Sequence, residues 1–197
     1  LLHGPHTVLS PVAYLSGINI VRDACQHPII GKFIHKVMFD ELMQTVDLPK
    51  ADMEKFAADV VERFENPFVD HQVTSIMLNS FPKFETRDLP GLKKYLKLNG
   101  KLPAGIVLGL AAIITYYKGG TRADGAEIKP NDSQEIMDLL TGLWATNDTE
   151  KITKGVLAAT QIWGEDLNNI PGLAAAVKAD LDSIQTKGML ETVKGIL

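Results

Sequence analysis

The sequence has little cysteine, no basic block and only a small charge imbalance. The chain has one cysteine, Cys25, so it cannot form an internal disulfide, and one cysteine alone cannot form a zinc site. This low cysteine content is typical of a protein from a reducing cytosol. The 20 lysines and arginines face 24 acidic residues, which leaves a net charge of −4. We therefore expect a cytoplasmic protein that binds neither nucleic acid nor a membrane surface.

Long apolar runs and a secretion signal are also missing. The longest stretch without Asp, Glu, Lys, Arg or His, residues 102–117, is shorter than the roughly 20 residues of a bilayer-spanning helix, and it predicts a buried core helix instead. No basic segment followed by an apolar one opens the chain, so nothing points to secretion. The chain starts at Leu1 without Met, in a motif-like stretch, and we expect a fragment of a longer protein.

Glycine-rich phosphate-binding motifs are absent as well. Neither G-x-G-x-x-G nor G-x-x-x-x-G-K occurs in the 197 residues. These motifs bring backbone N–H groups against the phosphates of a nucleotide. The sequence therefore shows no nucleotide or dinucleotide site of its own.

Helical periodicity dominates what is present. Apolar residues recur at steps of three and four after Pro28 and after Pro49, as one face of a helix requires. No alternating apolar and polar run predicts a strand, and glycines mark residues 118–130 as a loop. The sequence predicts one all-α domain over residues 1–197. Further helices are predicted between His6 and Cys25, over 102–117, after Asn131-Asp132, from Asp148-Thr149 to Trp163, and over 172–187 and 188–197.

Small and aromatic residues refine this prediction. Gly105 and Gly109 lie four residues apart on the apolar helix, a spacing that lets a second helix approach closely. Trp163 lies on an apolar face and is expected in the core. Tyr116, Tyr117, Lys118 and Arg122 border the loop, where we expect solvated side chains; the alternative is that they cover a cleft as a lid.

Two histidines flank a Gly-Pro turn at the start of the first predicted helix. His3 and His6 are three residues apart, and histidine can donate, accept or shuttle a proton near neutral pH. They could form a catalytic pair at the rim of a cleft. Alternatively, His6 caps the helix and His3 is solvated. A metal site is a third interpretation, but no third ligand is near in sequence.

A second polar cluster lies between Asn66 and Arg87. Short polar side chains crowd this segment, and two cations, Lys83 and Arg87, end it. Fixed donors and acceptors beside a cation suit a polyhydroxylated, anionic ligand. A polar surface whose Asn and Asp residues shape turns and cap helices explains the composition equally well. The short polar residues are Asp70, His71, Gln72, Thr74, Ser75, Asn79 and Ser80.

The motifs of the sequence resemble those of the mannitol dehydrogenase family. The signature of that family is Leu-Asn-Gly-x-His ahead of a long helix, and Leu2-His3-Gly4-Pro5-His6 matches it except at His3. The resemblance spans nearly the whole chain. It continues through residues 11–14, 40–42, 48–49, 63–72, 80–84, 102–103, 110–112, 116–119 and 163–167.

This resemblance implies roles for individual residues. His6 falls on the catalytic histidine that hydrogen-bonds the reacting oxygen, and His3 replaces an asparagine that stabilises negative charge on that oxygen. Lys83 falls on a substrate-binding lysine. Ser75 stands where mannitol dehydrogenases often carry an arginine, which favours a sugar acid over a plain polyol. The family's catalytic lysine would lie upstream of Leu1.

Two further residues have less defined places. Arg87 is the alternative to Lys83 as the cation that meets a substrate carboxylate. His71 either binds substrate or shapes the turn before it. Asn66 and Asp70 are expected to shape that turn rather than to contact substrate.

The resemblance also implies a fold and an activity. The fold would be the multi-helix C-terminal substrate domain of the family, which is similar to that of 6-phosphogluconate dehydrogenase. NAD would be bound mainly by an N-terminal Rossmann domain absent from this chain, and the chain alone would be inactive. The expected reaction is the reduction of the hexuronate tagaturonate to altronate by NADH. Fructuronate reduction, a mannitol-type polyol dehydrogenase and a non-catalytic helical interaction module are the alternatives.

Overall fold

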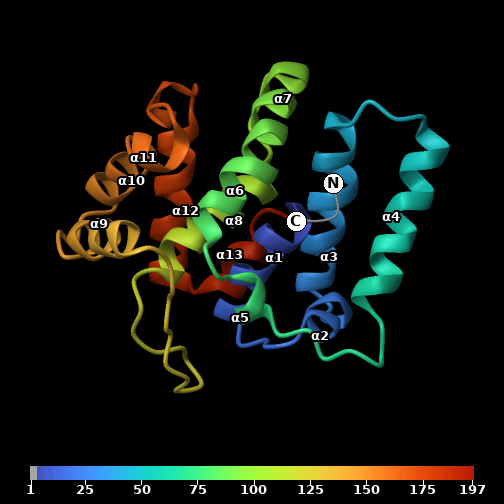
Figure 1. Ribbon diagram of the computed structural model, residues 1–197, viewed down its shortest axis with the longest axis horizontal. Helices are drawn as coiled ribbons and strands as arrows, with labels where there is room; N and C mark the ends of the chain where they lie inside the picture. The colour runs from blue at the N-terminus through green and yellow to red at the C-terminus, as the bar shows by residue number, and fades with distance from the viewer. Residues whose placement is uncertain (1–3) are drawn as a thin grey trace.

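The computed structural model describes residues 4–197, and every regular element in that range is a helix (Figure 1). Two isolated β-bridges, Ile20 to Gln72 and Thr121 to Glu127, join loop segments. The predicted all-α class is confirmed. His3 lies outside the described residues. The elements are α1 (Gly4–Leu15), α2 (Val21–Gln26), α3 (Ile30–His35), the π-helix η1 (Lys36–Leu42), the 3-10 helix η2 (Met43–Thr45), α4 (Lys50–Phe64), α5 (Val73–Ile76), α6 (Ser80–Arg87), α7 (Leu89–Asn99), α8 (Ala104–Tyr116), α9 (Gln134–Trp144), α10 (Thr149–Leu157), α11 (Thr160–Trp163), the 3-10 helix η3 (Leu167–Asn169), α12 (Leu173–Lys187) and α13 (Met189–Lys194).

Helix α8 is the buried centre of the molecule, as predicted for residues 102–117. All of its residues after Ala104 are buried, because the helix is apolar on every side. Helix α1 packs directly against it. A Cβ atom at Gly109 would lie 2.4 Å from Val8 Cγ1, and one at Gly105 would lie 2.6 Å from Val37 Cγ2. Gly109 therefore permits the close approach of α1 and Gly105 that of η1, so the two glycines face two helices rather than the single one that their spacing predicts.

The N-terminus of α8 is held by a carboxylate from η1. Glu41 is buried and accepts hydrogen bonds from the backbone N–H groups of Gly105 (2.7 Å) and Ile106 (2.9 Å). Burial raises the pKa of Glu41, and the two backbone hydrogen bonds oppose that rise. Periodicity predicts one helix from Pro28 to Leu42, whereas the structure has α3 followed by a π-helix. We attribute the change to the placement of Glu41 against α8.

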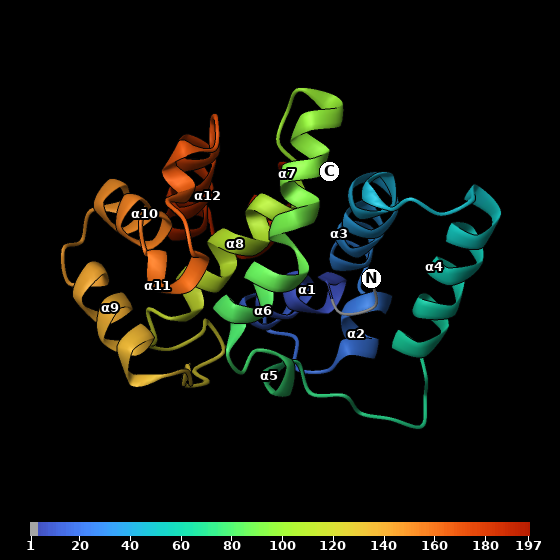
Figure 2. The ribbon, with the colours of Figure 1, turned by 45° about the horizontal axis from the view of Figure 1, so that its top comes forward.

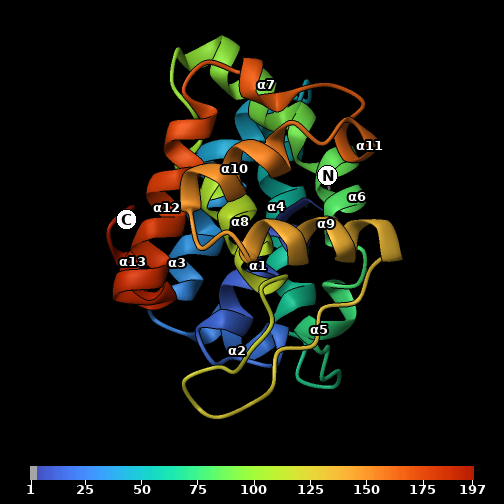
Figure 3. The same ribbon diagram turned by 90° about the vertical axis from the view of Figure 1, so that its left-hand side faces the viewer.

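The remaining helices surround this centre. Helix α4 forms one edge, and α9 and α10 form the opposite edge (Figures 1 and 2). Helix α12 packs on α8, α10 and α13, and Figure 3 shows α9, α10 and α12 on the same side of the molecule. Among residues 4–197, no helix is long and apolar enough to cross a membrane.

Several predicted boundaries are wrong at specific residues. The helix between His6 and Cys25 is two helices, because Gly17 adopts a positive φ of 89° after α1. The helix expected from Asp148 to Trp163 is also broken, between α10 and α11. Helix α9 is capped by Ser133, whose side chain accepts from the N–H of Ile136, rather than by Asn131 or Asp132.

The predicted burial is correct for Trp163 and wrong for Tyr116 and Tyr117. Trp163 is in the core, as expected, and its Nε1 donates to the carbonyl of Val156 at 2.8 Å. Tyr116 and Tyr117 are buried rather than solvated. Their rings extend α8 into the core, and their hydroxyls meet the loop that follows.

Candidate active site

His6 lies in the first turn of α1, at the wall of a cavity of about 270 Å³. Its ring centroid is 4.1 Å from that of Phe64 at the end of α4, and 5.9 Å from that of His71. The structure therefore brings two of the predicted site histidines into one cavity. The lining residues are His6, Val21, Arg63, Phe64, Asn66, Val69 and His71.

Backbone pairing holds the segment that carries His71. The N–H of Val21 donates to the His71 carbonyl at 3.0 Å, and the N–H of Val73 donates to the Asn19 carbonyl at 2.9 Å. The preceding turn is closed by Asn66, whose Oδ1 accepts from the N–H of Phe68.

The ion pair between Arg22 and Asp70, at 2.9 Å, fixes the same turn. Asn66 and Asp70 thus shape this turn, as predicted.

Lys83 lies on α6 with its side chain half-buried. Its Nζ donates to the carbonyl of Ile76 at 2.7 Å, which fixes the direction of the side chain. Burial lowers the pKa of Lys83, the nearby Arg87 lowers it further, and Asp132 opposes both. An ammonium group has three N–H donors, so two remain for other acceptors.

A buried hydrogen-bond network that the sequence did not reveal positions the start of α6. The Tyr117 hydroxyl donates to the carboxylate of Asp132 and accepts from the N–H of Ser80 at 3.3 Å. Burial and the hydrogen bond to Asp132 raise the pKa of Tyr117. The sequence predicts Asp132 as a helix cap, and no sequence pattern predicts its hydrogen bond with Tyr117. The network ties the end of the loop to the helix that carries Lys83.

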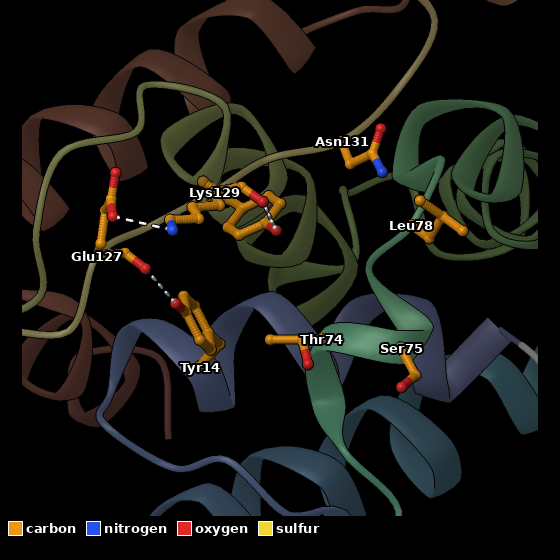
Figure 4. Close-up of a pocket in the computed structure, with 8 residues that line it drawn as sticks. Tyr14, Thr74, Ser75, Leu78, Glu127, Lys129 and Asn131 are labelled. Atoms are coloured by element: carbon orange, nitrogen blue, oxygen red, sulfur yellow. Dashed lines mark hydrogen bonds and ion pairs between the residues drawn. The ribbon is translucent and has the colours of Figure 1, made fainter.

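Ser75 lines a second and larger cavity, of about 580 Å³ (Figure 4). The hydroxyl of Tyr14 donates to the carbonyl of Glu127 at 3.2 Å, and Lys129 pairs with the Glu127 carboxylate at 3.1 Å. Ser75 is therefore not in the cavity of His6 and His71. The lining residues are Tyr14, Thr74, Ser75, Leu78, Tyr116, Glu127, Lys129 and Asn131.

Arg87 lines a third cavity, of about 210 Å³, together with Gly4 and Lys94. Each of the three cavities includes a residue of α1: His6 in the first, Tyr14 in the second and Gly4 in the third. His6 and His71 thus share one cavity, Ser75 and Arg87 line two others, and Lys83 lines none of the three. Within residues 4–197, no group of three or more His, Cys, Asp or Glu side chains is arranged to hold a metal ion.

The chain is a helical domain with a histidine in the first turn of α1, the helix that packs on the buried central helix α8. The family model of the mannitol dehydrogenase C-terminal domain matches residues 1–185. The chain belongs to the mannitol dehydrogenase family, and it corresponds to the C-terminal domain.

Two curated relatives give the more particular likeness. The chain is 80% identical over 197 residues to an altronate oxidoreductase of Bacteroides thetaiotaomicron and 78% identical to one of Phocaeicola vulgatus. In both cases all of this chain is covered, but only 41% of the relative's length.

Solved structures support the fold. The mannitol 2-dehydrogenase of Pseudomonas fluorescens, in a ternary complex with NAD and D-mannitol, superposes with a TM-score of 0.87 at 23% identity, covering 100% of this chain and 39% of that one. A D-sorbitol dehydrogenase in substrate-free form gives a TM-score of 0.81 at 16% identity, covering 98% of this chain and 39% of that one. At these identities the likeness concerns the fold alone.

Proposed function

We propose that this chain is the substrate-binding domain of an NAD-dependent hexuronate oxidoreductase that reduces tagaturonate to altronate in the cytoplasm. The identity of 80% to an altronate oxidoreductase over all 197 residues carries this proposal. Because the chain spans 41% of that relative's length, the activity belongs to a longer enzyme. The chain alone is expected to be inactive.

The reaction converts a keto group into a secondary alcohol. When bound, NADH would supply the hydride for the keto carbon, and the carbonyl oxygen would gain a proton. His6 would donate a hydrogen bond to that oxygen and so stabilise the negative charge that develops on it. His3 would assist. The family resemblance assigns proton delivery to a lysine upstream of Leu1.

Substrate recognition falls to the polar residues around α1. Lys83, already oriented by the Ile76 carbonyl, would bind the carboxylate or hydroxyls of the sugar acid. His71 shares the cavity of His6 and would contact a substrate hydroxyl. Ser75 and Arg87 line separate cavities, so their contacts require a substrate that extends beyond the His6 cavity.

The residues of this chain fit the substrate rather than the nucleotide. The 197 residues contain no glycine-rich phosphate loop, whereas the cavity beside α1 offers imidazole and amide groups that suit hydroxyls. NAD would therefore be held mainly by an N-terminal Rossmann domain in the remaining part of the enzyme. The NAD-containing complex of the structural relative supports a nicotinamide cofactor.

The test is NADH oxidation by the full-length enzyme with tagaturonate, fructuronate and fructose as substrates. We expect tagaturonate to be preferred, and we expect His6→Ala to lower kcat by at least about 100-fold, as loss of a polarising donor does. His35→Ala is the matched control, because His35 is exposed on α3 and stacks on Phe39. It should retain full activity.

The other outcomes each contradict part of the proposal. A preference for fructuronate would change the substrate, and turnover of fructose would place the enzyme among the polyol dehydrogenases. Full activity of His6→Ala would remove His6 from the mechanism. No turnover of any substrate by a folded enzyme would favour a helical interaction module.

A further inference from the structure

Asp88 is a buried carboxylate at the junction of α6 and α7. Its exposed fraction is 0%, and neither carboxylate oxygen has a hydrogen-bond partner among the described residues. Although Asp88 occupies the N-cap position of α7, its side chain makes no capping hydrogen bond there. Capping of α7 therefore does not account for the acidic side chain.

The carboxyl group faces the first residue of α1. A Cβ atom at Gly4 would lie 2.9 Å from Asp88 Oδ1, a separation at which one of the two groups has to move. The same Cβ would lie 3.5 Å from the Arg87 carbonyl and 3.6 Å from Leu42 Cδ1. Of these three atoms, Asp88 Oδ1 is the nearest to the position that a side chain at Gly4 would take.

Burial of this group without a partner costs free energy. An ionised carboxylate in a dry site is unfavourable, and burial raises the pKa of Asp88 well above its usual range, with Arg87 acting in the opposite direction. The positive end of the α1 dipole at Gly4 favours negative charge there. A carboxyl kept in so costly a place needs a role outside α7.

We propose that Asp88 is a positioning residue for His6: its carboxyl group packs against Gly4 and sets where α1 begins. His6 follows two residues later in the same helical turn, so a displacement of Gly4 also displaces the imidazole. The inference deepens the proposed function, because it rests on the role of His6 at the reacting oxygen.

The test compares variants of Gly4 and Asp88 in the full-length enzyme, with NADH-dependent tagaturonate reduction as the assay. Gly4→Ala and Asp88→Ala should each lower kcat by roughly 10- to 100-fold with a smaller change in KM, because a small displacement of a catalytic group slows the chemical step. In the double variant, the new methyl group enters the space that the carboxyl leaves. Its kcat should therefore be no lower than that of the worse single variant.

Asp88→Asn is the conservative variant. It preserves the shape of the carboxyl group without its negative charge, and it should keep kcat within about threefold of the wild type. It also covers the case in which Asp88→Ala fails to fold. Asp180→Asn is the matched control, because Asp180 is a half-buried acid on α12 and should leave kcat unchanged.

Multiplicative losses in the double variant would overturn the inference, as would wild-type kcat in Asp88→Ala or a large loss in Asp88→Asn. The His6→Ala variant distinguishes failure of the proposed role of His6 from failure of the inference about Asp88. If His6→Ala is fully active, the proposed role of His6 fails, and the inference about Asp88 fails with it. If it is inactive while the Asp88 variants are unaffected, only the inference fails.

Discussion

At the scale of single residues, Lys83 offers the most direct test of substrate charge. Lys83→Gln in the full-length enzyme should raise KM for tagaturonate by roughly 10- to 100-fold, because a charge-assisted hydrogen bond contributes about 1.5–3 kcal/mol. Glutamine removes the positive charge but keeps an N–H donor at this position. Steady-state kinetics measure the change.

Lys154→Gln is the control for this substitution. Lys154 forms an exposed ion pair with Glu150 on α10, and such pairs contribute little. An unchanged KM in Lys83→Gln would assign the substrate carboxylate to Arg87 or to another part of the enzyme.

The residues of the site were only partly predictable from the sequence. His6 and Lys83 stand in a motif and a polar cluster, and their types suggest their chemistry. The contacts of Tyr117 with Asp132 and of Asp88 with Gly4 join segments that are distant in the sequence. Such contacts arise from tertiary packing, for which a single sequence has no local signal.

At the scale of elements, the contact between α1 and α8 is tight enough to test by one methyl group. Gly109→Ala should destabilise the chain by about 1–3 kcal/mol, because the new Cβ would lie 2.4 Å from Val8 Cγ1 and 3.0 Å from Val8 Cβ. Urea denaturation followed by circular dichroism measures the loss.

Gly142→Ala is the matched control within another helix. Gly142 is exposed on α9, and its added Cβ would meet no atom within 4 Å. Alanine favours helix over glycine by roughly 0.5–1 kcal/mol, so this variant should be more stable than the wild type. Equal effects of the two substitutions would contradict the tight packing of α1 on α8.

The elements followed the sequence where one face was consistently apolar. Helices α4, α8 and α12 lie where periodicity or an apolar run predicts them. In these segments the local pattern of apolar residues is enough to indicate a helix and its buried face. The π-helix η1 was not predicted. It places Glu41 at the N-terminus of α8, where Glu41 accepts a hydrogen bond from Gly105, more than sixty residues away in the chain. The local sequence gives no signal for this contact.

At the scale of the whole molecule, three cavities border α1, and apolar side chains beside one of them are exposed. Phe68 is 92% exposed, and its neighbour Val69, which lines the His6 cavity, is 56% exposed. Adjacent exposed apolar side chains beside a cavity suit an interface. We expect the part of the longer enzyme outside this chain to cover Phe68, which would also close the His6 cavity.

Thiol labelling tests this cover. Burial raises the pKa of Cys25 to about 12, so the native thiol should react slowly near pH 8. The cysteine of Phe68→Cys should therefore be labelled rapidly in the 197-residue chain and at least about tenfold more slowly in the full-length enzyme, where docking excludes the reagent.

Leu98→Cys provides the comparison, because Leu98 is 59% exposed near the end of α7, away from the His6 cavity. Its labelling rate should be the same in both proteins. Wild-type full-length enzyme accounts for thiols outside this chain. Equal rates for Phe68→Cys in both proteins would show that Phe68 stays exposed, and the closure of the His6 cavity would then have to come from another surface.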